Sequence, residues 1–139
     1  MESPQPRWDF SQWIPQVAVV CLGLNDFSGL KDKEGNVSEE KSNFFRTGYH
    51  AFIQRLRTVY PGVKILAVAA FPEWIRKNVR QVVDEERING KRDVSYATFD
   101  EVPGGYVANG HPTVETHRVI ASQLIQVMED VKLFPRVRE

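Results

Sequence analysis

Apolar and polar positions follow two kinds of pattern along the chain. Three short runs, at residues 17–22, 64–71 and 93–99, consist mostly of apolar and β-branched residues. Runs of this kind are typical of strands that are buried on both faces of a parallel sheet. We therefore expect three strands in one parallel sheet.

The segments between these runs show helical periodicity, because apolar residues recur at three- and four-residue steps. A first helix ends at Pro61 and Gly62, and a second begins at Pro72 and ends near Asn89 and Gly90. A last helix begins near Pro112 and runs to about residue 131. The expected buried positions of the three helices are Phe44, Phe45, Tyr49, Phe52, Ile53, Leu56 and Tyr60, then Ile75, Val79, Val82 and Val83, then Val114, Ile120, Leu124, Val127 and Met128.

The alternation of strands and helices predicts a right-handed α/β fold with about three parallel strands and three flanking helices. Residues 1–139 have the length of one domain. Three strands are few for such a sheet, and its outer strands would expose unpaired edges. We therefore interpret the chain as an incomplete doubly wound domain, and we expect its open edge to promote dimerisation or aggregation.

Composition excludes several classes of function. The chain has 18 basic and 18 acidic residues, so its net charge of zero does not support nucleic-acid or membrane-surface binding. No apolar stretch approaches the roughly 20 residues of a membrane span. The single cysteine, Cys21, cannot form a disulfide framework or a cysteine-based metal site, and we expect it to be buried.

Two polar clusters follow strands, at the end of a parallel sheet where ligands bind. In the first cluster, Asn25 could donate its side-chain amide to a developing oxyanion, Gly23 would allow a sharp turn, and Asp26 could brace the loop. In the second cluster, residues 109–112, His111 could act as a base near neutral pH, with Pro112 fixing the start of the next helix. The alternative for the first cluster is a simple turn without a chemical role. The alternative for the second is that His111 is an ordinary histidine of a surface loop.

The remaining histidines give weaker signals. His117 is expected to pack or cap within the last helix, and His50 has no evident chemical partner. No group of histidine, aspartate and glutamate has the spacing of metal ligands, so we expect no metal and no cofactor.

The two clusters resemble the conserved blocks of SGNH (GDSL-type) hydrolases. Residues 23–26, GLND, resemble the block that holds the oxyanion-hole asparagine, and residues 109–117, NGHPTVETH, resemble the final histidine block. The RWDF and WIP sequences at residues 7–15 resemble carbohydrate esterase family two, and the similarity extends from about Trp8 to Val131. The resemblance implies a flavodoxin-like three-layer fold and O-deacetylation of acetylated sugars or xylan. It assigns the oxyanion-hole amide to Asn25, the general base to His111 and the turn to Gly23.

The chain departs from the family pattern at several positions. It has no Gly-Asp-Ser block, so the nucleophile is unknown, and the upstream glycine block that supplies a second oxyanion donor is also missing. Ala108 and Asn109 stand where an acidic residue usually precedes the histidine. Gly110 replaces an aromatic residue that often precedes it in family two.

Three functions remain open at this point. The chain could be the C-terminal portion of an esterase, a non-catalytic carbohydrate-binding or interaction module on the same scaffold, or an unrelated α/β interaction domain. The first predicts an acetylated carbohydrate as substrate, no nucleic-acid or membrane partner, and either a homodimer or a complementing N-terminal fragment.

Overall fold

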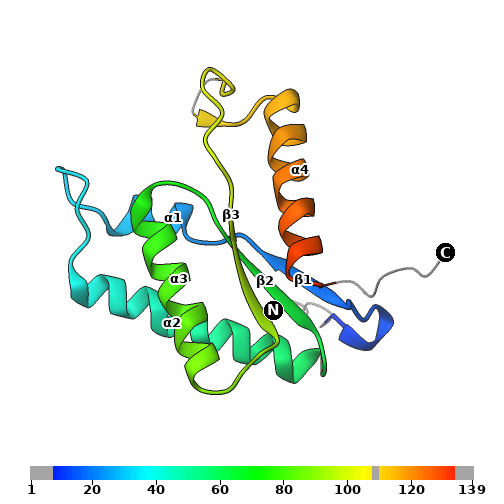
Figure 1. Ribbon diagram of the computed structural model, residues 1–139. Helices are drawn as coiled ribbons and strands as arrows, with labels where there is room; N and C mark the ends of the chain where they lie inside the picture. Colours follow the sequence, from blue (N-terminus) through cyan, green and yellow to red (C-terminus); the bar gives the residue numbers. More distant parts are fainter. Residues whose placement is uncertain (1–7, 108–109, 134–139) are drawn as a thin grey trace, which may run out of the picture.

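The computed structural model describes residues 8–107 and 110–133. Its sheet contains β1 (Val17–Val20), β2 (Lys64–Ala69) and β3 (Val94–Thr98), all parallel and in the order β1-β2-β3 (Figure 1). The three apolar runs thus form the three expected strands, and the prediction of a parallel sheet is confirmed.

The three expected helices are α2 (Glu39–Val59), α3 (Glu73–Ile88) and α4 (Val114–Asp130). A further helix, α1 (Leu24–Leu30), was not expected, and the prediction of a loop over residues 23–26 was wrong. The backbone N–H of Phe27 donates to the carbonyl of Gly23 over 2.8 Å and closes its first turn. Near the N-terminus, a 3-10 helix (Phe10–Gln12) is capped by Asp9.

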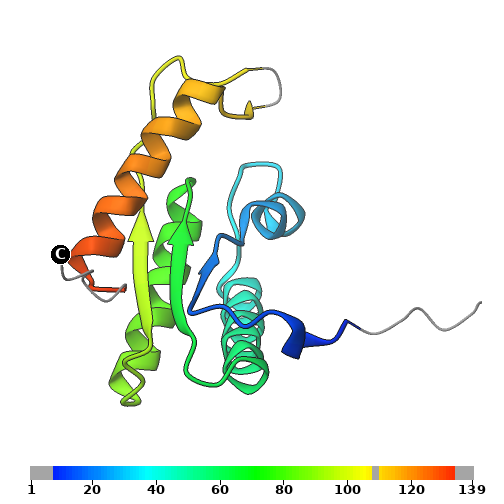
Figure 2. The same ribbon diagram turned by 90° about the vertical axis from the view of Figure 1, so that its right-hand side faces the viewer.

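The sheet forms the middle of three layers, with helices on both of its faces. Helices α1, α2 and α3 lie against one face, and α4 lies against the other (Figure 2). Ile53 of α2 and Val79 of α3 are completely buried on the first face, whereas Leu66 and Ala97 of the sheet face α4. No helix in the described ranges is long and apolar enough to cross a bilayer.

Several residues expected in the interior are exposed. Val114 is 70% exposed because α4 begins beyond the end of the sheet, and Phe44 is 75% exposed on the outer side of α2. Trp8 and Trp13 are also exposed. Cys21, expected to be buried, is exposed at the end of β1, which has a neighbour on one side only.

A network of charged side chains joins α2 to α3 and to the start of β3. Arg57 donates to both carboxylate oxygens of Asp93, at 2.7 and 2.8 Å, and to Glu86 at 2.6 Å. His50 contacts Glu86 at 2.6 Å and Glu85 at 2.8 Å through its two ring nitrogens. The expectation that His50 lacks a partner was therefore wrong.

The His50 contacts make stability depend on pH. Burial lowers the pKa of His50, but hydrogen bonds to Glu85 and Glu86 outweigh this effect, so the pKa lies above its ordinary value of 6.5. The resulting stabilisation is complete below about pH 6.5 and is lost as the pH rises through the folded-state pKa. We expect the difference in melting temperature between the unmodified chain and His50→Gln to shrink as the pH is raised in that range. A difference that grows with pH would contradict this assignment.

Candidate functional site

Both predicted site segments lie at the same end of the sheet, beyond the carboxyl ends of the strands (Figure 2). Asn25 follows β1 in the first turn of α1, and His111 lies in the connection between β3 and α4. Strand β2 separates the two strands from which these segments extend. Both side chains are exposed, and Asn109 lies outside the described residues.

Gly23 makes the sharp turn that fixes Asn25. Its φ angle of 119° lies in the region that favours glycine, and the residue is buried. A Cβ atom added here would lie 3.0 Å from Cγ2 of Ile75 and 3.3 Å from Cζ of Phe45. The turn is therefore pressed against α2 and α3, which hold the start of α1 in place, and the predicted sharp turn is confirmed.

The side chains after this turn face outward. None of the hydrogen bonds among the described residues uses the amide of Asn25, which leaves both of its N–H groups available to a ligand. Asp26 does not brace the backbone as expected, since none of the hydrogen bonds among the described residues uses its carboxylate; it lies exposed in the first turn of α1. It lines a hollow of about 270 Å³ with Leu22, Phe44 and Phe52 among its neighbours.

His111 lies on a tight backbone loop. Tyr106 and Pro112 form an antiparallel bridge, and the N–H of Val107 donates to the carbonyl of His111 over 2.9 Å. Gly110 has a φ of 73°, and its N–H donates to the carbonyl of Val107 over 3.1 Å. The backbone of His111 is therefore held from both sides while its ring remains exposed.

Gly105 and Thr116 anchor this loop to α4. The carbonyl of Gly105 accepts from the N–H of Thr113 at 2.9 Å and from the hydroxyl of Thr116 at 2.5 Å. Thr116 is 1% exposed, and Thr113 caps α4 by accepting from the N–H of Thr116 over 3.1 Å. Sequence reasoning missed Thr116, although a threonine three residues after a helix-capping threonine was the available signal.

Replacing Gly105 with alanine is expected to break this anchor. The added Cβ would lie 2.2 Å from the hydroxyl oxygen of Thr116, so the hydrogen bond and the backbone next to it must shift. Leaving a buried donor unpaired costs about 1–3 kcal/mol, which should appear as a lower free energy of unfolding in a denaturant titration.

Gly48→Ala is the matched control for that substitution. Gly48 lies inside α2, and no atom approaches its added Cβ within 4 Å. Alanine should stabilise this helix by up to about 1 kcal/mol. Equal effects of the two substitutions would show that Gly105 does not anchor the loop.

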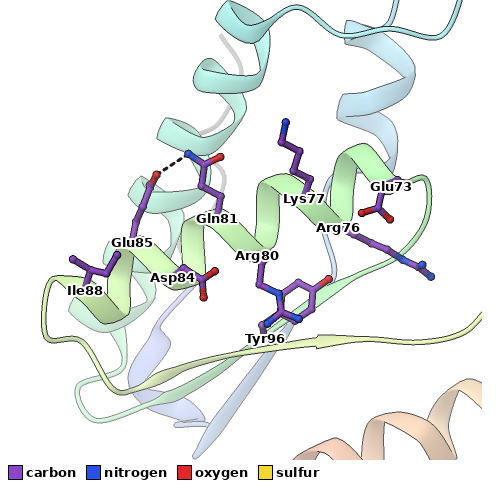
Figure 3. Close-up of a pocket in the computed structure, with 9 residues that line it drawn as sticks. All are labelled: Glu73, Arg76, Lys77, Arg80, Gln81, Asp84, Glu85, Ile88 and Tyr96. Atoms are coloured by element: carbon purple, nitrogen blue, oxygen red, sulfur yellow. Dashed lines mark hydrogen bonds between the residues drawn. The ribbon is translucent and has the colours of Figure 1, made fainter.

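Two further hollows among the described residues do not include the predicted site residues. One of about 500 Å³ lies along the outer side of α3, where the guanidinium carbon of Arg80 stands 3.8 Å from the ring centroid of Tyr96 (Figure 3). Gln81 donates to Glu85 across the same helix surface over 2.8 Å. The hollow lined by Asp26 adjoins a predicted site segment.

Comparison with known proteins finds related esterases. No model of a known protein family matches the chain. The cellulase/esterase CelE of Acetivibrio thermocellus is 32% identical over 126 residues, which cover 85% of this chain and 14% of that protein.

Solved structures give the same result. A family two carbohydrate esterase from Clostridium thermocellum, in complex with cellohexaose, is 28% identical with a TM-score of 0.74, and the match covers 92% of this chain and 40% of that one. An acetyl xylan esterase from Butyrivibrio proteoclasticus, 16% identical with a TM-score of 0.79 over 94% of this chain and 41% of that one, shares the fold. The chain thus spans less than half the length of the proteins that it matches.

Proposed function

We propose that this chain, an SGNH-type relative of the family two carbohydrate esterases in both sequence and fold, is part of a serine-dependent enzyme that removes O-acetyl groups from carbohydrate. One observation carries the proposal. Asn25 stands on a turn fixed by Gly23 after the carboxyl end of β1, and His111 lies in the connection that follows the carboxyl end of β3; the two positions match the family's blocks. Because the related proteins are esterases, we propose ester hydrolysis as the reaction in which Asn25 and His111 take part.

In the proposed reaction, a serine hydroxyl attacks the acetyl carbonyl and His111 accepts its proton. The Asn25 amide donates a hydrogen bond to the oxyanion of the tetrahedral intermediate. The bond between the acetyl carbon and the sugar oxygen then breaks, and His111 gives the proton to that departing oxygen, which leaves as a sugar hydroxyl. Water, activated by the same histidine, releases acetate from the serine.

The serine is proposed to come from a segment outside this chain. The hydroxyls of Ser28 and Ser122 donate to carbonyls of their own helices, each over 3.0 Å. Ser42 is buried and accepts from the indole N–H of Trp74 at 2.9 Å. These contacts give Ser28, Ser42 and Ser122 structural roles. None of the contacts involves a histidine, so none of these three hydroxyls has a base beside it.

No carboxylate in the described part of the chain hydrogen-bonds to His111. We propose that a backbone carbonyl orients its ring in place of the usual acid, because Ala108 and Asn109 stand where that acid is usually found. Such a carbonyl can select the tautomer but contributes less stabilisation to the imidazolium than a full negative charge.

Release of acetate from an activated acetyl ester tests the proposal. The isolated chain should show no hydrolysis above background. Addition of a segment that carries the family's Gly-Asp-Ser block should produce hydrolysis that depends on Asn25 and His111. Hydrolysis by the isolated chain that disappears in His111→Ala would show instead that this chain supplies its own nucleophile.

A second candidate is carbohydrate binding without hydrolysis. The missing acidic residue before His111 favours it, and the related Clostridium thermocellum structure contains cellohexaose. Titration calorimetry with cellohexaose discriminates between the candidates. Saturable binding by the chain, without acetate release in any combination with the added segment, would favour the binding module.

A further inference from the structure

The outer side of α3 carries three basic side chains that have no acidic partner among the described residues. Arg76, Lys77 and Arg80 line the hollow of about 500 Å³, together with Tyr96 of β3 (Figure 3). We call this hollow the α3 hollow. None of the ion pairs in the described part of the chain includes any of the three basic side chains. Its volume lies in the range of small-molecule sites, so the α3 hollow has room and positive charge for a ligand.

The guanidinium of Arg80 is held in place without the use of its hydrogen bonds. Its central carbon lies 3.8 Å from the ring centroid of Tyr96, which is half-buried beneath it (Figure 3). No hydrogen bond among the described residues uses this guanidinium. Stacking on an aromatic ring fixes the plane of a guanidinium and leaves its N–H groups available. Arg80 therefore presents a fixed pair of donors of the kind that matches the two oxygens of a carboxylate.

Arg76 supplies a second guanidinium, four residues earlier on the same side of α3. Its Nη2 atom donates to the carbonyl of Phe99 over 2.7 Å, just beyond the end of β3. Its Nε atom is buried and has no hydrogen-bond partner among the described residues. Because buried donors are normally paired, this end of the α3 hollow favours an anion beside it. Lys77 extends from the opposite side of the helix and is not needed for such a contact (Figure 3).

Acidic side chains in the α3 hollow restrict what can bind there. Both carboxylate oxygens of Glu85 are occupied, one by His50 and the other by Gln81, each at 2.8 Å. Glu73 and Asp84 also line the hollow, and both are exposed. Their carboxylates repel a densely charged anion, but they accept hydrogen bonds from hydroxyl groups. The hollow therefore favours a ligand with one negative charge and several hydroxyl groups.

We propose that the α3 hollow binds a uronic acid unit of a polysaccharide, with its carboxylate held by Arg76 and Arg80 and a ring hydroxyl donating to Asp84. This inference rests on the proposed function, because that function makes a carbohydrate the substrate, and it names an acidic polysaccharide as the substrate class. Phe99, which Arg76 contacts, begins the connection that carries His111. The acidic unit and the acetyl group are therefore expected to belong to the same polysaccharide.

Titration calorimetry with a matched pair of ligands tests this inference. The probe is an acetyl-free xylo-oligosaccharide with one glucuronic acid side group. Its control is the same oligosaccharide with that carboxyl group reduced to a primary alcohol. The acidic ligand should bind about tenfold more tightly or better, because two guanidinium groups make charge-assisted hydrogen bonds to its carboxylate. Equal affinity for the two ligands, or no binding of the acidic one, would overturn the proposal.

Substitutions of Arg80 locate the carboxylate. Arg80→Met keeps an unbranched apolar chain over Tyr96 and removes the guanidinium, so the preference for the acidic ligand should fall below about threefold. Arg80→Lys keeps the charge but loses the paired donors, and it should retain part of the preference. Arg55→Met, on the exposed surface of α2, is the matched control and should leave the preference unchanged. Circular dichroism establishes that each variant is folded. An unchanged preference in Arg80→Met, or an equal loss in Arg55→Met, would overturn the proposal.

Two further measurements separate the uronic acid site from other sites. Inorganic sulfate at the concentration of the acidic oligosaccharide should not displace it, and displacement would identify a general anion site and overturn the proposal. His111→Ala should bind the acidic ligand as tightly as the unmodified chain does. Loss of binding in this variant would place the ligand at the candidate esterase site instead.

Acetate release distinguishes failure of this proposal from failure of the proposed function. The expected preference for the acidic ligand, without acetate release in any combination with the added segment, would contradict the proposed function and leave the α3 hollow supported. Acetate release without any preference for the acidic ligand would overturn the uronic acid site alone.

Discussion

Replacing His111 with alanine is expected to reduce ester hydrolysis by the complemented enzyme by about 10⁴-fold or more. The other histidine near the loop, His117, lies six residues further along the chain, on α4, and has no role in the proposed proton transfer. Loss of the base in a serine-dependent hydrolase has an effect of this size, since the serine hydroxyl is a weak nucleophile without it. The measurement is kcat/KM for an activated acetyl ester with the chain and the serine-bearing segment mixed.

His117→Ala is the control for this substitution. His117 is exposed and belongs to the same helical region, so its replacement should change kcat/KM by less than about threefold. Equal losses in the two variants would assign the effect to the fold of the region rather than to proton transfer. Full activity of His111→Ala would remove His111 from the proposed mechanism.

Replacing Arg57 with alanine should cause the largest loss of stability. The Arg57 side chain is 14% exposed, and it contacts Glu86 and Asp93, whose side chains are 11% and 32% exposed. Removing it leaves Glu86 charged, largely buried and paired with His50 alone. Breaking a buried pair of this kind costs about 3–5 kcal/mol. We expect the free energy of unfolding to fall by an amount near the lower end of this range, because Asp93 remains partly hydrated.

A denaturant titration beside Arg118→Ala tests this expectation. Arg118 pairs with Glu115 at 2.9 Å, but both side chains are more than 70% exposed. Loss of that pair should change the free energy of unfolding by less than about 1 kcal/mol. Similar decreases in the two variants would show that the Arg57 network contributes no more than an ordinary surface ion pair.

Local patterns predicted most of the fold. The three apolar runs became β1, β2 and β3, and α3 buries the four apolar residues that its periodicity selected. Helix α1 was missed because its seven residues include Asn25, Asp26 and Gly29, which favour turns. Its position depends on tertiary packing, since the ring centroid of Phe27 lies 5.7 Å from that of Trp74.

Contacts between distant parts of the sequence, including those that support the site, were predicted less completely, for a related reason. The partners of His50 lie 35 and 36 residues away in sequence, a separation at which no local pattern reveals a contact. The anchor between Gly105 and Thr116 likewise forms only when the loop folds back on α4. Asn25 and His111 could be proposed because they lie in short blocks that a family resemblance identifies.

The most direct test of the account is labelling with a fluorophosphonate, which phosphonylates an activated serine hydroxyl with release of fluoride. We would label the mixture of this chain and the serine-bearing segment and locate the adduct by mass spectrometry. The account predicts an adduct on the serine of the segment, formed only in the presence of this chain and lost with His111→Ala. An adduct on a serine of this chain, or labelling of the segment that does not require His111, would contradict it.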